Sequence, residues 1–173
     1  MDAPGRAVSL VILGAWIGML VASWVVAAVN FRTADRVLGE SARPETSVKL
    51  APVPAEDRRM VLRHLASEIN RWIFRRWAPA QILLGCVVLA ARRAGGGCRA
   101  LVGIALALTV VQAAGLTPRI AELGRALDFV PRPLPAITAR RFGLLHASYV
   151  VADLAKAVLL SAAAWILARR PLP

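Results

Sequence analysis

The sequence has few of the residues that carry most enzyme and metal chemistry. Two histidines and two cysteines among 173 residues fall short of a metal or haem site. Cys86 and Cys98 form neither a disulfide framework nor a zinc-binding pattern. There is also no Gly-rich phosphate loop and no nucleophile paired with a base. We therefore expect no enzyme activity, no cofactor and no bound metal.

Acidic residues are also scarce, since 10 Asp and Glu stand against 22 Lys and Arg, for a net charge of +12. In a soluble protein this excess would indicate a nucleic-acid partner. Here the basic residues flank apolar runs without a nucleic-acid motif, as they do when they anchor membrane spans at headgroups. We expect the partner to be the lipid bilayer, with anionic headgroups at its arginine-rich side, and not nucleic acid.

Apolar residues make up 58% of the chain, against roughly 45–50% in soluble domains. Four apolar runs predict membrane spans, because a span needs roughly 20 such residues. They lie at about residues 7–30, 73–92, 99–117 and 142–168. The first is too long for a signal-peptide core, so we expect a permanent helix. The predicted fold is an all-α, polytopic membrane four-helix bundle, forming a single integral membrane domain over residues 1–173.

The connections differ in composition. Residues 33–54 contain three prolines and are predicted to form an exposed loop. Residues 55–72 predict a basic amphipathic helix that lies at the membrane interface or leads straight into the second span. After the third span, Pro118 is expected to bend or end the helix, and residues 131–135 to form an extended spacer.

The basic residues also predict orientation. The first and third connections carry ten Lys and Arg in residues 31–76 and five in residues 117–141, against six at the termini and second connection. By the positive-inside rule, the long connections are cytoplasmic and both termini lie outside. Arginine outnumbers lysine strongly, and Ala, Gly and Pro are abundant, which is typical of a GC-rich bacterial genome. We therefore expect a multi-pass protein of the bacterial inner membrane.

The fourth span carries the strongest functional signal. At helical spacing, His146, Tyr149, Asp153 and Lys156 share one face. Ionisable groups at mid-membrane cost roughly 2.5–3.5 kcal/mol each, so they need partners or a wet cavity. The candidate polar intramembrane cluster is completed by residues of the preceding segment, Gln112 and Arg119.

Three interpretations of this face remain open. Asp153 and Lys156 could form a structural ion pair at i,i+3. The face could instead relay protons or bind a small ionic solute, with Arg119 as the charge at the mouth. It could also meet an opposite charge on another membrane protein.

Small residues in the first span predict helix packing. Gly14, Gly18 and Ala22 recur every four residues, forming a flat stripe where another helix can approach closely. Trp16 lies deep in the same span and must pack inside the protein or face lipid.

Several short motifs occur in a characteristic order. They are Gly14-Ala15-Trp16 with Gly18, Phe31-Arg32, Leu116-Thr117-Pro118-Arg119 and Phe142-x-x-x-His146. In this order the chain resembles the four-helix membrane family of unknown function that includes eukaryotic transmembrane protein 205. The resemblance implies the fold and a membrane location, but no activity. That family has Ser and Asn three and seven residues after the His, where this chain has Tyr149 and Asp153.

We therefore expect a non-enzymatic accessory or interaction subunit of the inner membrane, working with a membrane protein partner or as a homo-oligomer. The alternative is a small-solute or proton transport or resistance protein that uses the polar face of the fourth helix.

Overall fold

The computed structural model describes residues 3–39, 43–90, 96–130 and 133–169, and every regular element within these ranges is helical. In chain order the elements are α1 (Ala3–Leu38), α2 (Pro44–Leu50), α3 (Ala55–Ala90), α4 (Gly96–Val111), a π-helical turn (Gln112–Leu116), α5 (Thr117–Ala126) and α6 (Ala136–Ala168). Four continuous helices are long and apolar enough to cross a membrane, and they comprise α1, α3, α4 with α5, and α6. The prediction of an all-α chain with four such helices is confirmed.

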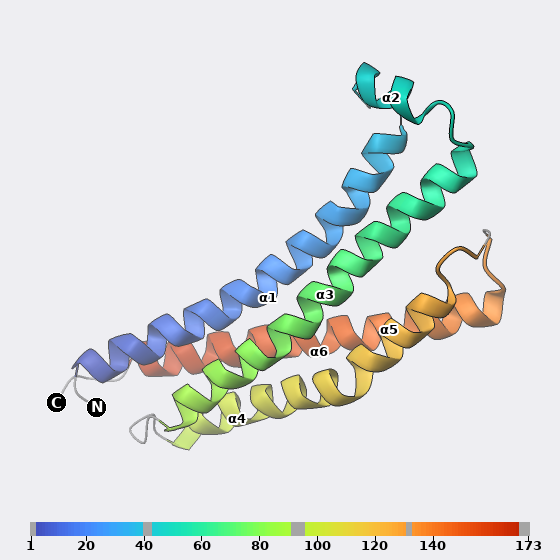
Figure 1. The fold of residues 1–173 in the computed structure, drawn as a ribbon. Helices are drawn as coiled ribbons and strands as arrows, with labels where there is room; N and C mark the ends of the chain where they lie inside the picture. The colour runs from blue at the N-terminus through green and yellow to red at the C-terminus, as the bar shows by residue number, and fades with distance from the viewer. Residues whose placement is uncertain (1–2, 40–42, 91–95, 131–132, 170–173) are drawn as a thin grey trace.

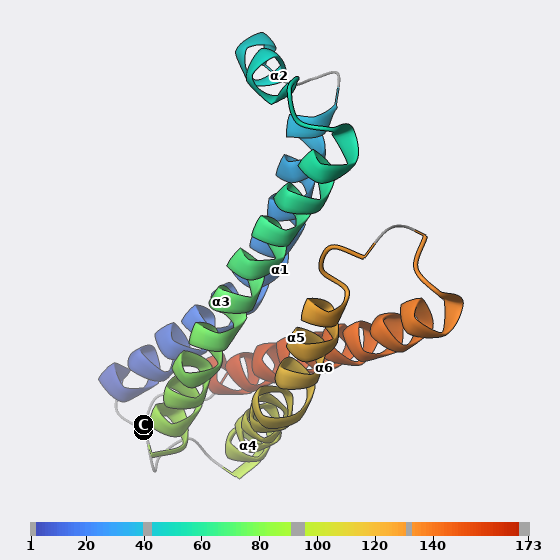
Figure 2. The same ribbon diagram turned by 45° about the vertical axis from the view of Figure 1, so that its right-hand side comes forward.

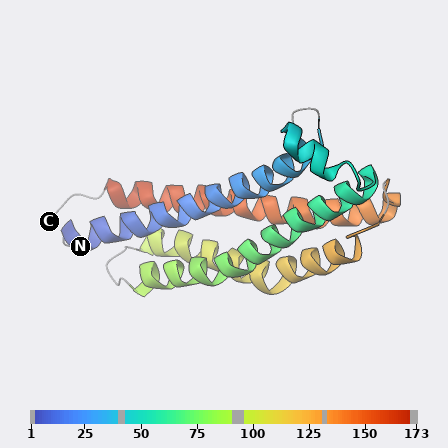
Figure 3. The ribbon, with the colours of Figure 1, turned by 45° about the horizontal axis from the view of Figure 1, so that its top comes forward.

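The long helices pack as two antiparallel pairs, α1 with α3, and α4 and α5 with α6. The start of α1 and the end of α6 lie at the same end of the molecule (Figure 3). At that end all four helices come together, and towards the opposite end the two pairs diverge (Figures 1 and 2). The helices therefore share a common core at one end only.

The first long connection contains more helix than predicted. Because no proline or glycine occurs between Asn30 and Leu38, α1 continues past the expected end of the span. Pro44 then occupies the first turn of α2, where its missing N–H costs no hydrogen bond. The prediction of a loop over residues 33–54 is thus wrong for residues 33–38 and 44–50.

Residues 55–72, predicted to form an amphipathic interfacial helix, and residues 73–90 of the predicted second span belong to one uninterrupted helix, α3. Of the two arrangements that the sequence left open, this is the one in which the basic segment leads straight into the span. Residues 91 and 92 of that predicted span lie outside the described ranges. Pro79 lies within α3 without ending it.

The third long helix changes geometry before Pro118. A proline has no N–H to donate and its ring crowds the carbonyl four residues earlier. The π-helical turn immediately precedes α5, and the helix axis bends there (Figure 1). Helix nevertheless continues to Ala126, so Pro118 accompanies a bend and does not end the helix. Residues 131 and 132 of the predicted spacer lie outside the described ranges, whereas residues 133–135 are not helical.

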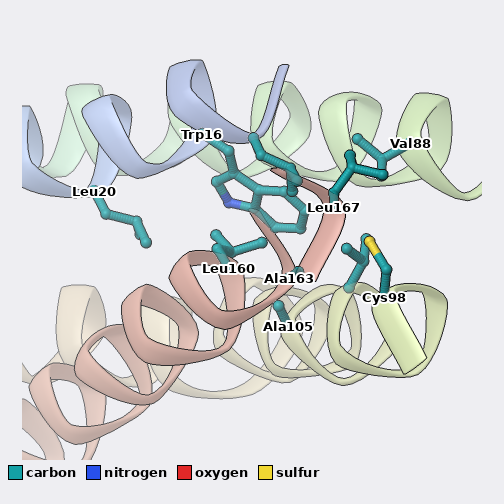
Figure 4. Packing of buried hydrophobic residues seen from close by; sticks show 10 residues of the cluster. Trp16, Leu20, Val88, Cys98, Ala105, Leu160, Ala163 and Leu167 are labelled. Atoms are coloured by element: carbon teal, nitrogen blue, oxygen red, sulfur yellow. The ribbon is translucent and has the colours of Figure 1, made fainter. Parts of the chain in front are cut away.

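The apolar core fills the end where the helices converge, and all four long helices contribute to it (Figure 4). Its fully or almost fully buried members are Leu13, Trp16, Leu20, Val88, Cys98, Val102, Ala105, Leu160, Ala163 and Leu167. Trp16 is the largest of them and is completely buried. Trp16 therefore packs inside the protein and does not face lipid.

The predicted glycine stripe does not hold this core together. Gly14 and Gly18 are exposed, and a Cβ added to either would have no heavy atom within 4 Å. The prediction that they allow close helix approach within the chain is therefore wrong, and Ala22 is only half-buried. The close approach occurs instead at Gly85 of α3, where a Cβ would lie 2.9 Å from the Trp16 ring. The face of α1 that carries Trp16 points inward instead, because burying an indole ring removes far more apolar surface from water than burying glycine does.

Candidate functional site

Asp153 and Lys156 lie one turn apart on α6 at the inner edge of the core. Their side chains are 2% and 1% exposed, and the Lys156 Nζ lies 2.8 Å from the Asp153 Oδ1. Each charge is therefore neutralised by its neighbour where water does not reach it. Because burying an ion pair removes hydration from both groups, such a pair is stable only when further hydrogen bonds are made.

The other three long helices supply those hydrogen bonds. Asp153 accepts from the Trp24 Nε1 at 3.1 Å and from the Gln112 Nε2 at 3.0 Å. Lys156 donates to the Gln81 Oε1 at 3.1 Å, and the same oxygen accepts from the Trp16 Nε1 at 3.1 Å. We call these six residues the polar network. It joins α1, α3, α6 and the π-helical turn through neutral and charged groups.

The sequence predicted three members of the network: Gln112, Asp153 and Lys156. For Trp16 it predicted only a packing role. It did not predict roles for Gln81 or Trp24. The available signal for Gln81 was that it is the sole polar residue between Trp77 and Ala91. A tryptophan N–H inside an apolar helix needs an acceptor, which is the corresponding signal for Trp24.

Gln112 also ties the π-helical turn to α6, because its Nε2 donates to the Tyr149 carbonyl oxygen at 3.0 Å. Its Oε1 is buried and accepts no hydrogen bond from any described residue. A buried acceptor without a donor costs free energy, so this oxygen could receive a water or another donor beside Asp153. π-Helical turns are frequent at functional sites.

A cavity of about 1380 Å³ lies between the diverging helix pairs and extends to the network. Among its lining residues, Trp24 and Asp153 mark the inner end, because both belong to the network. The first turns of α3 and the residues after α5 also line it and mark the opposite end. Its volume exceeds the roughly 300–1,000 Å³ of ordinary small-molecule sites. The buried charges therefore have hydrogen-bonding partners, and a cavity lies beside them as well.

The remaining candidates of the predicted cluster lie along or outside this cavity. Tyr149 lines it and contacts the Phe74 ring edge-to-face, with centroids 5.6 Å apart. His146 also lines it, stacked on Phe142 at 6.3 Å, but makes no hydrogen bond to the network. Arg119 is exposed on α5 and belongs to neither the network nor the cavity wall.

A second polar cluster joins the two helix pairs near the outer end of the cavity. Asp128, just beyond α5, lies 3.0 Å from the His64 Nδ1 and accepts from the Arg71 guanidinium at 2.9 Å. Phe129 adopts a left-handed φ of 62° and contacts the His64 ring with centroids 4.7 Å apart. Because these contacts hold the turn after α5 against α3, we call this cluster the latch.

The latch also brings together three groups that could bind a metal. Ligand atoms of His64, Glu68 and Asp128 lie within 4.8 Å of one another. However, Arg71 is hydrogen-bonded to both carboxylates. The guanidinium already supplies the positive charge that a metal would bring, so we interpret the cluster as a structural clamp.

We expect Asp128→Asn to loosen the latch. The change removes the charge that faces Arg71 and His64, and hydrogen bonds to charged groups contribute about 1.5–3 kcal/mol. The free energy of unfolding in mixed micelles should fall by an amount in this range. Spin labels placed at the exposed positions Val61 and Ile137 should report a broader distance distribution between α3 and α6.

The matched control is Asp35→Asn, which removes the 3.1 Å ion pair with Arg63. Both of those side chains are about half exposed, so this pair should contribute only about 0–1 kcal/mol. Equal losses in the two variants, with an unchanged label distribution, would show that the latch does not hold the helix pairs together.

Comparison with protein families, curated proteins and solved structures finds no match, so the resemblance to the family of transmembrane protein 205 stays a prediction.

Proposed function

We propose that this chain is a multi-pass membrane protein that takes up a small solute, from one side of the membrane, into the cavity between its two helix pairs. The observation that carries the proposal is that the cavity ends at the polar network. Apolar walls with a few fixed polar groups are typical of small-molecule sites. Ionisable groups within membrane helices also commonly mark substrate and ion pathways.

In this proposal the polar network is the floor of the site. Asp153 accepts from three donors and Lys156 donates to two acceptors, so both side chains are held in place. A fixed floor closes the inner end of the cavity and does not rearrange when a solute binds. The converged core on the other side of the network is packed with apolar side chains, which supports access from one end only.

The alternative is the accessory subunit that the sequence also favours. A partner that recognised Asp153 or Lys156 would have to displace Trp24, Gln81 or Gln112, since these already surround the pair. The burial of the pair within the chain therefore favours the solute proposal. An accessory role would have to use other surfaces.

The proposed side of access follows from the positive-inside rule. The cavity wall includes the start of α3 and the turn after α5, and therefore both long connections that carry most of the arginines. We propose that these connections are cytoplasmic and that the cavity opens there, with both termini outside.

Cysteine labelling tests this proposal. In a background with Cys86→Ala and Cys98→Ala, we expect Val150→Cys in the cavity wall to react with a membrane-impermeant methanethiosulfonate. The reaction should occur from the cytoplasmic side only. The matched control is Val158→Cys, two turns further along the same helix and 69% exposed, where lipid would surround the thiol. Because only a hydrated thiol ionises and reacts, Val150→Cys should label at least about tenfold faster.

Equal rates at the two positions would contradict a water-accessible cavity. Labelling of Val150→Cys from the outside would keep the cavity and overturn the proposed orientation. A third cysteine at Ala163 in the core, which is 0% exposed, should not react from either side.

A further inference from the structure

The lining of the cavity carries more positive charge than its own carboxylates can balance. Six arginines line it, against Glu56, Asp128 and Asp153. Asp153 is balanced by Lys156, and Asp128 by Arg71. Arg63 pairs with Asp35 outside the lining, and the other four lining arginines form no ion pair with a described carboxylate: Arg58, Arg59, Arg75 and Arg125. Glu56 is the one lining carboxylate with no ion pair among the described residues, so the four guanidinium groups still outnumber it.

One of these arginines also has an unsatisfied donor. The Nε of Arg58 is buried and has no hydrogen-bond acceptor among the described residues. A buried donor without an acceptor costs about 1–3 kcal/mol, which a bound carboxylate or phosphate oxygen would recover. This observation is independent of the charge excess and points to an anion at the same place.

Three of these four arginines line the outer end of the cavity, away from its apolar inner part. Arg58, Arg59 and Arg125 line the outer end, whereas Arg75 follows Phe74 nearer the inner end. Arg58 is half-buried and the other three are exposed. The inner part is lined by Trp24, Ala27, Phe74, Ala113, Val150 and Leu154. Along α3, the distance from Arg58 to Phe74 is about 24 Å at the helical rise of 1.5 Å per residue. Over that length α3 contributes mainly polar side chains to the lining, whereas α1, the third long helix and α6 supply the apolar wall. The cavity thus combines a cationic mouth with an apolar wall formed by those three helices.

From this arrangement we infer that the solute is an anionic amphiphile, with its carboxylate or phosphate at Arg58 and Arg125 and its hydrocarbon chain along the apolar wall towards the polar network. The inference rests on the proposed function and specifies the ligand class of the same cavity. Arginine suits such a headgroup because its guanidinium donates two parallel hydrogen bonds to a carboxylate or phosphate.

Equilibrium binding of palmitate and of its uncharged methyl ester to the full-length protein in detergent tests the inference. We expect palmitate to bind at least about tenfold more tightly than the ester. Arg58→Gln combined with Arg125→Gln should remove most of this preference. The matched control combines Arg32→Gln with Arg36→Gln, which removes the same charge from exposed positions on α1 that do not line the cavity and should keep the preference.

Equal affinity for palmitate and its ester would overturn the anionic headgroup, and so would equal losses in the two double variants. If neither probe binds while Val150→Cys still labels, the amphiphile is wrong and the accessible cavity stands. Displacement of palmitate by phosphatidylglycerol, but not by phosphatidylcholine, would support the inference with a bilayer lipid as the source. Palmitate that binds with the expected preference and resists both lipids would support it with a free long-chain acid.

Discussion

Lys156→Met should destabilise the protein by about 3–5 kcal/mol, the usual cost of leaving a buried charge without its partner. Methionine has nearly the length of lysine, so packing should change little. The Asp153 carboxylate would keep its hydrogen bonds from Trp24 and Gln112 but lose the only cation within contact distance among the described side chains. The free energy of unfolding, measured by dodecyl sulfate titration in mixed micelles, checks this value.

Asp153→Asn should be costly for the reciprocal reason, because it leaves the Lys156 ammonium buried with Gln81 as its remaining acceptor. Combining it with Lys156→Met removes both charges, and the amide oxygen can still accept from Trp24. The double variant should therefore cost less than the sum of the single changes by about 0.5–3 kcal/mol, the range for side chains in direct contact.

The double-mutant cycle also separates a structural role from a functional one. If the double variant regains stability and still binds palmitate, the pair serves only to hold α6 in place. If it regains stability and loses binding, the polar floor acts on the solute. Additive losses from the two single changes would contradict the ion pair itself, because two groups that interact directly cannot be removed independently.

Gly85→Ala should destabilise the core by about 1–3 kcal/mol, the usual effect of overpacking. The new methyl carbon would lie 2.9 Å from Cη2 and Cζ3 of Trp16 and 3.0 Å from Cδ1 of Leu106. The indole cannot move freely, because it is completely buried and its Nε1 donates to Gln81. We therefore expect the strain to reach the polar network. The same change made together with Trp16→Phe should cost less, since the smaller ring leaves space beside Gly85.

The control for Gly85 is a second glycine in a helix with open space around it. A Cβ at Gly103 of α4 would have no heavy atom within 4 Å. Gly103→Ala should therefore stabilise the protein, by about 0.5–1 kcal/mol, because alanine loses less conformational freedom in a helix. Opposite signs at the two glycines would identify steric contact as the cause. Destabilisation of similar size at both would contradict the packing described at Trp16.

Secondary structure was predictable because each apolar run is long and bounded by charge. The ends of the helices were less so. Within residues 33–54, glycine and proline occur only from Gly39 onwards, so helix continues through Leu38, and it resumes at Pro44. Likewise, Pro118 correctly predicted a change in the geometry of the third long helix. Whether helix continued beyond it depended on the π-helical turn that accommodates the proline ring. Turn residues show where a helix can be interrupted, and neighbouring contacts decide whether it is.

The candidate site was predictable to the extent that charge in an apolar helix is rare. Asp153 and Lys156 stood out in the sequence, and their spacing of three residues predicted that they would meet. Gln81 and Trp24 could not be assigned to them, because the partner of a buried polar group depends on which helix faces it. Gly14 and Gly18 illustrate the same limit, since a small-residue stripe does not reveal whether it faces inward.

Local composition was enough to predict an all-helical chain with four helices able to span a membrane and a charged pair within the last. These follow from local composition and from the rule that apolar surroundings force backbone groups into helices. The folded arrangement was needed to see that the two helix pairs converge on Trp16 and diverge beyond the network, leaving a cavity that ends at Asp153. Relative helix placement depends on which side chains meet across more than a hundred residues of chain, as Trp24 and Asp153 do. Such contacts leave no periodic signal in either segment alone.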